Sequence, residues 1–131
     1  MKKTIAIIGS IIFLIIISAF IYNDQNNPIV GTWVSTQDSK DTWVFTSDNQ
    51  AKSYYDDELL DTYTYKVTRD PVQCGVDMHE TLDRYPSESI LVLTNTQTNK
   101  QKCDLVYKLD EQFLTWRPFG YPHISHFKRQ Q

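Results

Sequence analysis

The sequence lacks an excess of basic residues, which separates it from most nucleic-acid-binding proteins. Of its 131 residues, 13 are Lys or Arg and 16 are Asp or Glu, so the formal net charge is −3. Without Lys2 and Lys3, which precede an apolar run, 11 basic residues stand against 16 acidic ones, a net charge of −5. Such a surface repels phosphate groups and anionic lipid head groups. We therefore expect no nucleic-acid partner.

Cysteines and catalytic motifs are also scarce. Two cysteines are too few, by themselves, for a disulfide-rich scaffold or a four-ligand zinc site. The sequence has no Gly-x-Ser-x-Gly motif, no phosphate-binding loop and no His-Glu-x-x-His motif. His79, His123 and His126 are the only histidines, and the spacing of the last two places them on opposite faces of a strand. We therefore predict no enzyme, no metal site and no cofactor.

The N-terminus carries an uncharged apolar run from Ile5 to Tyr22, 18 residues long. A helix of that length spans about 27 Å, close to the hydrocarbon core of a bilayer. Lys2 and Lys3 favour an N-terminus in the cytoplasm and export of the remainder. The run predicts an uncleaved transmembrane anchor, and the alternative is a cleaved signal peptide, although Ile17-Ser18-Ala19 is a poor cleavage site. The rest of the chain is expected on the exported face of the cytoplasmic membrane, periplasmic or at the cell surface, or released if the run is cleaved.

The remaining chain has period-two alternation and no helical periodicity. In the segment from Asp61 to Asp70, Tyr63, Tyr65 and Val67 share one face while threonines and a lysine share the other. Such alternation is typical of half-buried strands. We divide the chain into an anchor or signal with a linker, 1–28, and an all-β domain, 29–131. The expected strands are near 31–36, 41–47, 50–55, 60–69, 88–95, 101–109, 112–117 and 121–129.

The connections between these segments are short, which favours consecutive antiparallel hairpins. The exception is 71–87, a loop with room for a short helical turn. Eight strands in a meander can close into an up-and-down barrel or pack as two sheets, and closure removes exposed edges. One face of each strand is apolar, so we expect that face to point inward. In 101–109 this reasoning places Cys103, Leu105, Tyr107 and Leu109 inside.

A series of short motifs follows in chain order after the linker. The motifs are Gly31-Thr32-Trp33, Trp43-Val44-Phe45, Tyr54-Tyr55, Tyr63-Thr64-Tyr65, Gln73-Cys74-Gly75, Leu91–Asn95, Cys103 with Tyr107 and Leu109, and Phe127-Lys128. This series resembles the small lipocalin-like domain of exported bacterial proteins. The resemblance covers Ile29 to about Arg129 and implies an eight-stranded antiparallel barrel of the calycin type. It also implies that Trp33 packs across a closed end of the barrel beneath a late basic residue, either Lys128 or Arg129.

An even number of cysteines in an exported chain favours a disulfide, here between Cys74 and Cys103. The alternative is two free thiols. The bond would tie the long loop to the start of a strand.

Two functions from different classes remain open. The first is a binding module for a small hydrophobic ligand inside the barrel. The second is a structural or protein-interaction barrel whose aromatic side chains fill the interior. For the first we expect Tyr63, Tyr65, Tyr107 and Trp116 to line the ligand site, with Trp33 and Trp43 as structural residues. The oligomeric state is left open.

Overall fold

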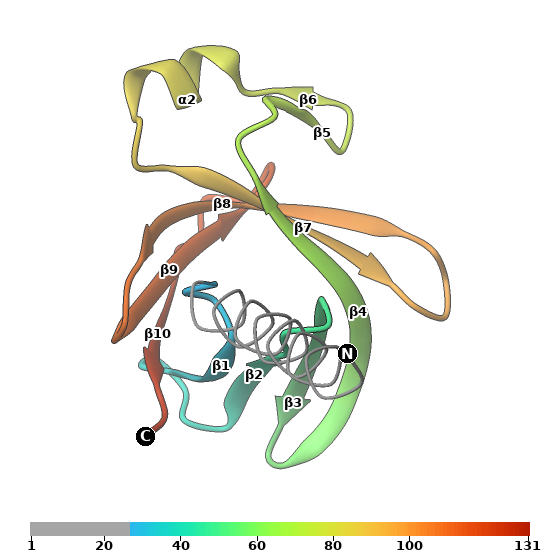
Figure 1. The fold of residues 1–131 in the computed structure, drawn as a ribbon. Coiled ribbons are helices and arrows are strands. Elements are labelled where there is room, and N and C mark those ends of the chain that lie inside the picture. Colours follow the sequence, from blue (N-terminus) through green and yellow to red (C-terminus); the bar gives the residue numbers. More distant parts are fainter. Residues whose placement is uncertain (1–26) are drawn as a thin grey trace, which may run out of the picture.

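Eight antiparallel strands close into a barrel in the structure, a computed structural model in which residues 27–131 are described (Figure 1). The order around the barrel is β1-β10-β9-β8-β7-β4-β3-β2, and β1 closes on β10 through residue pairs that include Trp33 and Arg129. The barrel strands are β1 (Gly31–Ser35), β2 (Asp41–Phe45), β3 (Gln50–Tyr55), β4 (Glu58–Thr68), β7 (Ser89–Asn95), β8 (Gln101–Leu109), β9 (Phe113–Pro118) and β10 (Ser125–Arg129).

These bounds confirm the strands expected from alternation. Seven of them begin and end within two residues of the expected positions, and only β10 starts later, at Ser125 rather than 121. The β3–β4 hairpin turns through Asp56 and Asp57, whose φ values of 51° and 65° are those of a type I′ turn. Aspartate tolerates this left-handed conformation better than most residues. The acidic cluster at this hairpin therefore has a conformational role.

The long connection between β4 and β7 forms an excursion outside the barrel, residues 71–87, above the barrel in the view of Figure 1. It contains a small hairpin, β5 (Val72–Gln73) and β6 (Val76–Asp77), and one short helix, α2 (His79–Arg84). The helical turn expected there is confirmed, and the hairpin was not expected. The Arg69 side chain holds the excursion in place by donating hydrogen bonds to the backbone carbonyls of Leu82, Pro86 and Glu88.

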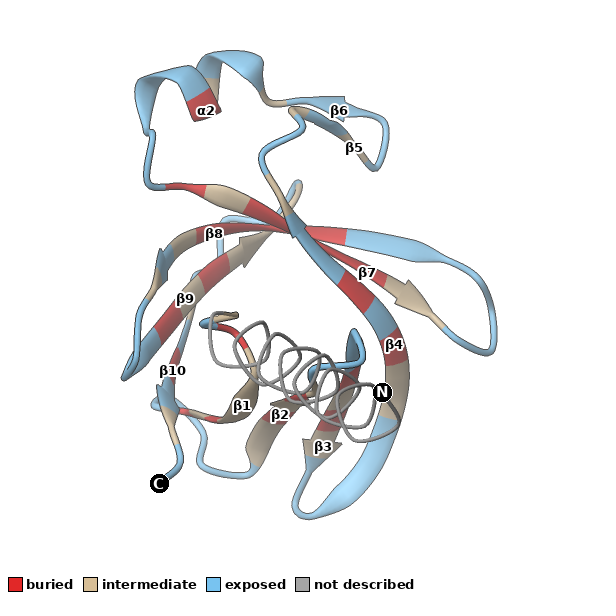
Figure 2. Cartoon of the chain, in the orientation of Figure 1, coloured by how far each residue is buried: buried red, intermediate tan, exposed pale blue. Residues whose placement is uncertain are grey.

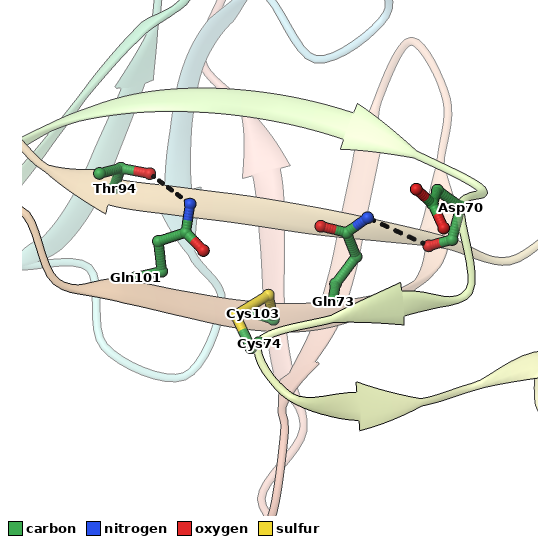
Figure 3. The surroundings of a disulfide bond; sticks show 6 residues. All are labelled: Asp70, Gln73, Cys74, Thr94, Gln101 and Cys103. Atoms are coloured by element: carbon green, nitrogen blue, oxygen red, sulfur yellow. Dashed lines mark hydrogen bonds between the residues drawn. A yellow bond between two sulfur atoms is a disulfide. The ribbon is translucent and has the colours of Figure 1, made fainter.

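A disulfide joins the excursion to the barrel wall and confirms the expected pairing of the two cysteines (Figure 3). Cys74 lies in the turn between β5 and β6, and Cys103 lies near the start of β8. Their Cα atoms are 6.1 Å apart, within the usual range for a disulfide. The bond closes a loop of sequence separation 29.

The buried apolar side chains form two clusters, one inside the barrel and one beneath the excursion. Figure 2 shows buried segments along β4, β7, β8 and β9. The inner cluster fills the barrel, and its largest fully buried side chains include Trp33, Phe45 and Phe127. The outer cluster lies between the excursion and the outer faces of β7 and β8. Its residues are Leu82, Ile90, Val92, Cys103 and Leu105, with Met78, Tyr107 and Phe119 packed against them.

The outer cluster corrects one expectation. Cys103, Leu105 and Tyr107 were expected to point into the barrel, but they pack on its outside. The inward residues of this strand are Asp104 and Val106, whose partners across β7 and β9 include the inner-cluster residues Leu91 and Trp116. The excursion covers the outer face, so that face can be apolar without being exposed to water.

A bulge in β8 explains why Leu109 points into the barrel, as expected, although Cys103, Leu105 and Tyr107 do not. The pairing of β8 with β9 shifts register between Val106 and Lys108. This extra residue returns Leu109 to the inner cluster.

The expected membrane anchor, 5–22, lies outside the described residues. Within 27–131 the structure contains no helix with the length and hydrophobicity needed to cross a membrane.

Candidate functional site

The two ends of the barrel differ in what covers them. At one end, here called the closed end, Arg129 lies across Trp33, with its Cζ atom 4.2 Å from the ring centroid. The guanidinium donates hydrogen bonds to the backbone carbonyls of Pro28, Val30 and Glu111. The Trp33 indole Nε1–H donates to the Ile29 carbonyl at 2.8 Å, and the side chain is fully buried.

Gly31 makes room for this arrangement at the closed end. Its φ is +143°, and a Cβ atom built there would collide with the Arg129 guanidinium. The position therefore needs glycine for both its conformation and its space. Of the two basic residues that the sequence offered, Arg129 is the one over Trp33, whereas Lys128 is exposed.

The opposite end, here called the open end, is the end formed by loops 36–40, 56–57, 96–100 and 119–124. Three aromatic side chains lie on this side of the inner cluster. The rings of Trp43 and Tyr63 stack with centroids 5.7 Å apart, and the Trp116 ring meets Trp43 edge to face at 5.4 Å. Facing pairs of this kind add to the stability that burial provides.

A lysine covers two of these rings from the open end. Lys102 pairs across β7 and β8 with Leu93, a residue of the inner cluster. Its side chain therefore points into the barrel at the open end, here called the mouth. Its Nζ atom lies 4.8 Å from the centroid of the Trp43 ring and 5.1 Å from that of Tyr63. Both distances are within the range of cation–π attraction. The barrel therefore positions a positive charge over two aromatic faces.

Asp104 is the next inward residue of β8 below Lys102. It is only 2% exposed, and its Oδ2 atom has no hydrogen-bond partner among the described residues. Burial raises the pKa of this carboxyl to about 6, against the opposing effect of the Lys102 charge. A buried carboxylate oxygen without a hydrogen-bond partner is costly, so a functional role is expected at this position.

Further acidic groups surround the mouth. Asp61 accepts hydrogen bonds from the Tyr63 hydroxyl at 3.2 Å and from Asn95 Nδ2 at 3.0 Å. Burial, with smaller contributions from Asp61 and Asp104, raises the pKa of Tyr63 to about 12. Burial and the charge of Asp38 raise the pKa of Asp41, and Lys102 lowers it. The open end thus combines aromatic faces with negative charge.

The four residues expected to line a ligand site do not lie together in the structure. Tyr63 and Trp116 lie together on the open-end side of the inner cluster. Tyr65 lies toward the closed end, where its hydroxyl donates to the Thr46 carbonyl at 2.9 Å and accepts from Asn27 Nδ2 at 3.4 Å. Tyr107 lies in the outer cluster with Arg117 over its ring. Trp33 and Trp43, expected to be structural, both belong to the inner cluster.

Sequence reasoning missed Lys102 and Asp104 as residues of the site. Both were assigned to the polar, outward face of their strand because the alternate positions Cys103 and Leu105 are apolar. The signal that could have corrected this was the long loop with a cysteine. A disulfide from that loop to position 103 requires Cys103 to face outward, and its neighbours then face inward.

Two hollows of the described chain lie away from the aromatic side chains of the open end. A hollow of about 410 Å³ at the closed-end rim is lined by Asn27, Tyr65 and Leu109, among others. A second, of about 440 Å³, lies on the outer face by Phe113 and His126. Within 27–131, no group of three His, Cys, Asp or Glu side chains could hold a metal ion.

No family model matches the chain, and no curated protein or solved structure is significantly similar to it. The closed eight-stranded antiparallel barrel is therefore established by the structure alone. Membership of a lipocalin-like family stays a prediction from the sequence motifs.

Proposed function

We propose that residues 29–131 form a non-enzymatic binding module that holds one small, largely apolar molecule at the open end of the barrel. The observation that carries this proposal is the contiguous aromatic surface of Trp43, Tyr63 and Trp116 below the mouth. A barrel of eight strands encloses just enough space for side chains or for one small ligand. The three rings offer the large apolar area that such a ligand needs.

Entry of a ligand requires Lys102 to move, and its position permits this. The residue is exposed, and its flexible side chain carries the ammonium group over the two rings. Rotation of this side chain into solvent frees the faces of Trp43 and Tyr63. The rest of the inner cluster can then stay packed while the mouth accepts a ligand.

The proposal places the module on the exported side of a cytoplasmic membrane, held by the N-terminal run. The Cys74–Cys103 disulfide supports an oxidising compartment. Fractionation of cells that express the full chain tests this placement. We expect the chain in the membrane fraction and sensitive to protease added outside the membrane. A chain recovered with cytoplasmic proteins and free thiols would contradict it.

A second candidate function is a protein-interaction barrel with a filled core. It is favoured by close contacts between rings deeper in the barrel, such as Trp116 and Phe127 with centroids 4.6 Å apart. In this alternative the aromatic side chains fill the barrel for stability, and the outer surface carries the function.

Titration of tryptophan fluorescence distinguishes the two candidates. The full chain is titrated in dodecyl maltoside with a neutral dye such as Nile red and with fatty acids, and the signal from empty micelles is subtracted. We expect saturable binding of the dye that Tyr63→Leu weakens about tenfold, the size expected for an aromatic contact. Tyr107→Leu, on the outer face, is the matched control and leaves binding unchanged.

Two results would contradict the binding proposal. One is the absence of saturable binding by every probe. The other is an equal effect of the Tyr63 and Tyr107 substitutions, because it would place the probe outside the barrel mouth. Circular dichroism of each variant shows whether the β fold is retained.

A further inference from the structure

We propose that the ligand of the open end is a small organic cation, whose ammonium group takes the position that Lys102 Nζ occupies over Trp43 and Tyr63. This inference rests on the proposed binding function and specifies the chemical class of its ligand. In the free protein the chain provides its own cation at this place. Lys102 is then a tethered occupant that the ligand displaces.

The position of Lys102 shows that the two rings are arranged for a cation. A single ammonium nitrogen lies within about 5 Å of both ring centroids, at 4.8 and 5.1 Å. Attraction between a cation and an aromatic face is strongest where water is excluded, and quaternary ammonium ligands are recognised in this way. Trp43 and Tyr63 are 7% and 8% exposed, so their faces are largely shielded from water.

Asp104 supplies the negative charge that a buried cation needs. It follows Lys102 as the next inward residue of β8, and its charge acts on both Lys102 and Tyr63. The carboxylate is buried, and its Oδ2 atom has no partner within the described part of the chain. Nor does Lys102 form an ion pair within 4.0 Å with any acidic side chain of that part. The site therefore holds a carboxylate with one unpaired oxygen, which an incoming cation can neutralise.

The charge around the mouth selects against anions. Asp41 lies close enough to Lys102 for the lysine charge to lower its pKa, and Asp61 binds the Tyr63 hydroxyl. Displacement of Lys102 removes the positive charge that acts on Asp41 and Asp104. A carboxylate ligand such as a fatty acid is then repelled, whereas an ammonium ligand is attracted.

The test compares two molecules of the same shape that differ in charge. Choline carries a quaternary ammonium group, and 3,3-dimethylbutan-1-ol is its neutral counterpart. Each is titrated into the full chain in dodecyl maltoside, and the indole N–H signals of the three tryptophans are followed by NMR. Binding at the open end shifts the Trp43 signal more than the Trp33 signal, because the Trp33 indole N–H is bonded to the Ile29 carbonyl at the closed end.

Substitutions at the two residues of β8 should act in opposite directions. Lys102→Ala removes the tethered competitor, and we expect affinity for choline to rise about tenfold. Asp104→Asn keeps the shape and removes the charge, and we expect affinity to fall about tenfold. Lys108→Ala is the control for the first, because this lysine lies 4.9 Å from the Phe113 ring on the outer face. Glu88→Gln is the control for the second, since Glu88 is the other buried carboxylate with an unpaired oxygen among the described residues.

The outcomes separate the inference from the function on which it rests. Equal binding of choline and its neutral counterpart to Lys102→Ala would overturn the cation inference and leave the binding barrel intact. Absence of binding by both, with no binding of Nile red, would overturn both. Choline affinity that is unchanged in Lys102→Ala and Asp104→Asn would place the cation elsewhere and overturn the inference. If Lys102→Ala fails to fold, Lys102→Gln removes the charge while keeping most of the side chain.

Discussion

Arg129 lies directly over Trp33, with its Cζ atom 4.2 Å from the ring centroid, and together they seal one end of the barrel. The pair joins the first strand to the last, β1 to β10, at the point where the barrel closes. The same guanidinium binds the carbonyls of Pro28 and Val30, which lead into β1. One side chain therefore holds together the two strands that close the barrel and the segment that precedes β1.

Removal of Arg129 should destabilise the domain. Arg129→Ala leaves three backbone carbonyls without their donor and uncovers Trp33, so we expect a loss of about 2–4 kcal/mol in the free energy of unfolding. Urea denaturation followed by tryptophan fluorescence measures this loss. Lys128→Ala is the matched control, because Lys128 is exposed, and should change stability by less than about 0.5 kcal/mol. Equal effects of the two substitutions would contradict the role of Arg129.

Trp33 itself should behave as a structural residue. Its side chain is fully buried and its indole nitrogen is hydrogen-bonded, so Trp33→Ala should cost about 3–5 kcal/mol. Denaturation of the variant measures the loss. A variant with unchanged stability that fails to bind a ligand would instead make Trp33 a residue of the binding site.

The disulfide should stabilise the domain by lowering the conformational entropy of the unfolded chain. For a loop of sequence separation 29, the chain-entropy treatment gives about 3–4 kcal/mol. We expect the double variant Cys74→Ser, Cys103→Ser to lose about this amount, with faster hydrogen exchange in the excursion than in β2 and β3. Thiol titration of the denatured wild-type chain from the exported compartment should find no free thiol. Two reactive thiols would show that the bond does not form there.

Asp104 should make stability depend on pH in a defined direction. Its folded pKa of about 6 exceeds the ordinary value of 3.8 because the carboxyl is buried. The folded state therefore holds this proton more tightly than the unfolded state does, and stability falls as pH rises from about 4 to above 6. The penalty above pH 6 is about 3 kcal/mol.

Asp104→Asn removes this penalty and provides the test. We expect the variant to be more stable than the wild-type chain at pH 7.5 and equally stable near pH 3.5. The difference between the two chains isolates Asp104 from the other carboxylates. A difference that does not change with pH would contradict the raised pKa.

The sequence by itself predicted the strands and favoured the pairing of Cys74 with Cys103, and the family resemblance implied the place of Trp33. Alternation of side chains is a local property, because successive residues of a strand face opposite sides. Short turns join most consecutive strands, so a meander of eight strands is readable from the chain order. For this reason the strands expected around Trp43 and Tyr63 agree with the structure.

Only the tertiary structure decided which face of β8 points inward. Alternation divides Cys103, Leu105 and Tyr107 from Lys102 and Asp104 but does not say which group is inside. The answer depends on the excursion, which is distant in the sequence and covers the outer face of β8 through Leu82 and the disulfide. An apolar face can be buried inside the barrel or beneath another segment, and burial removes it from water equally well in both cases. The opposite face of β8 therefore points inward and places Lys102 and Asp104 at the open end of the barrel.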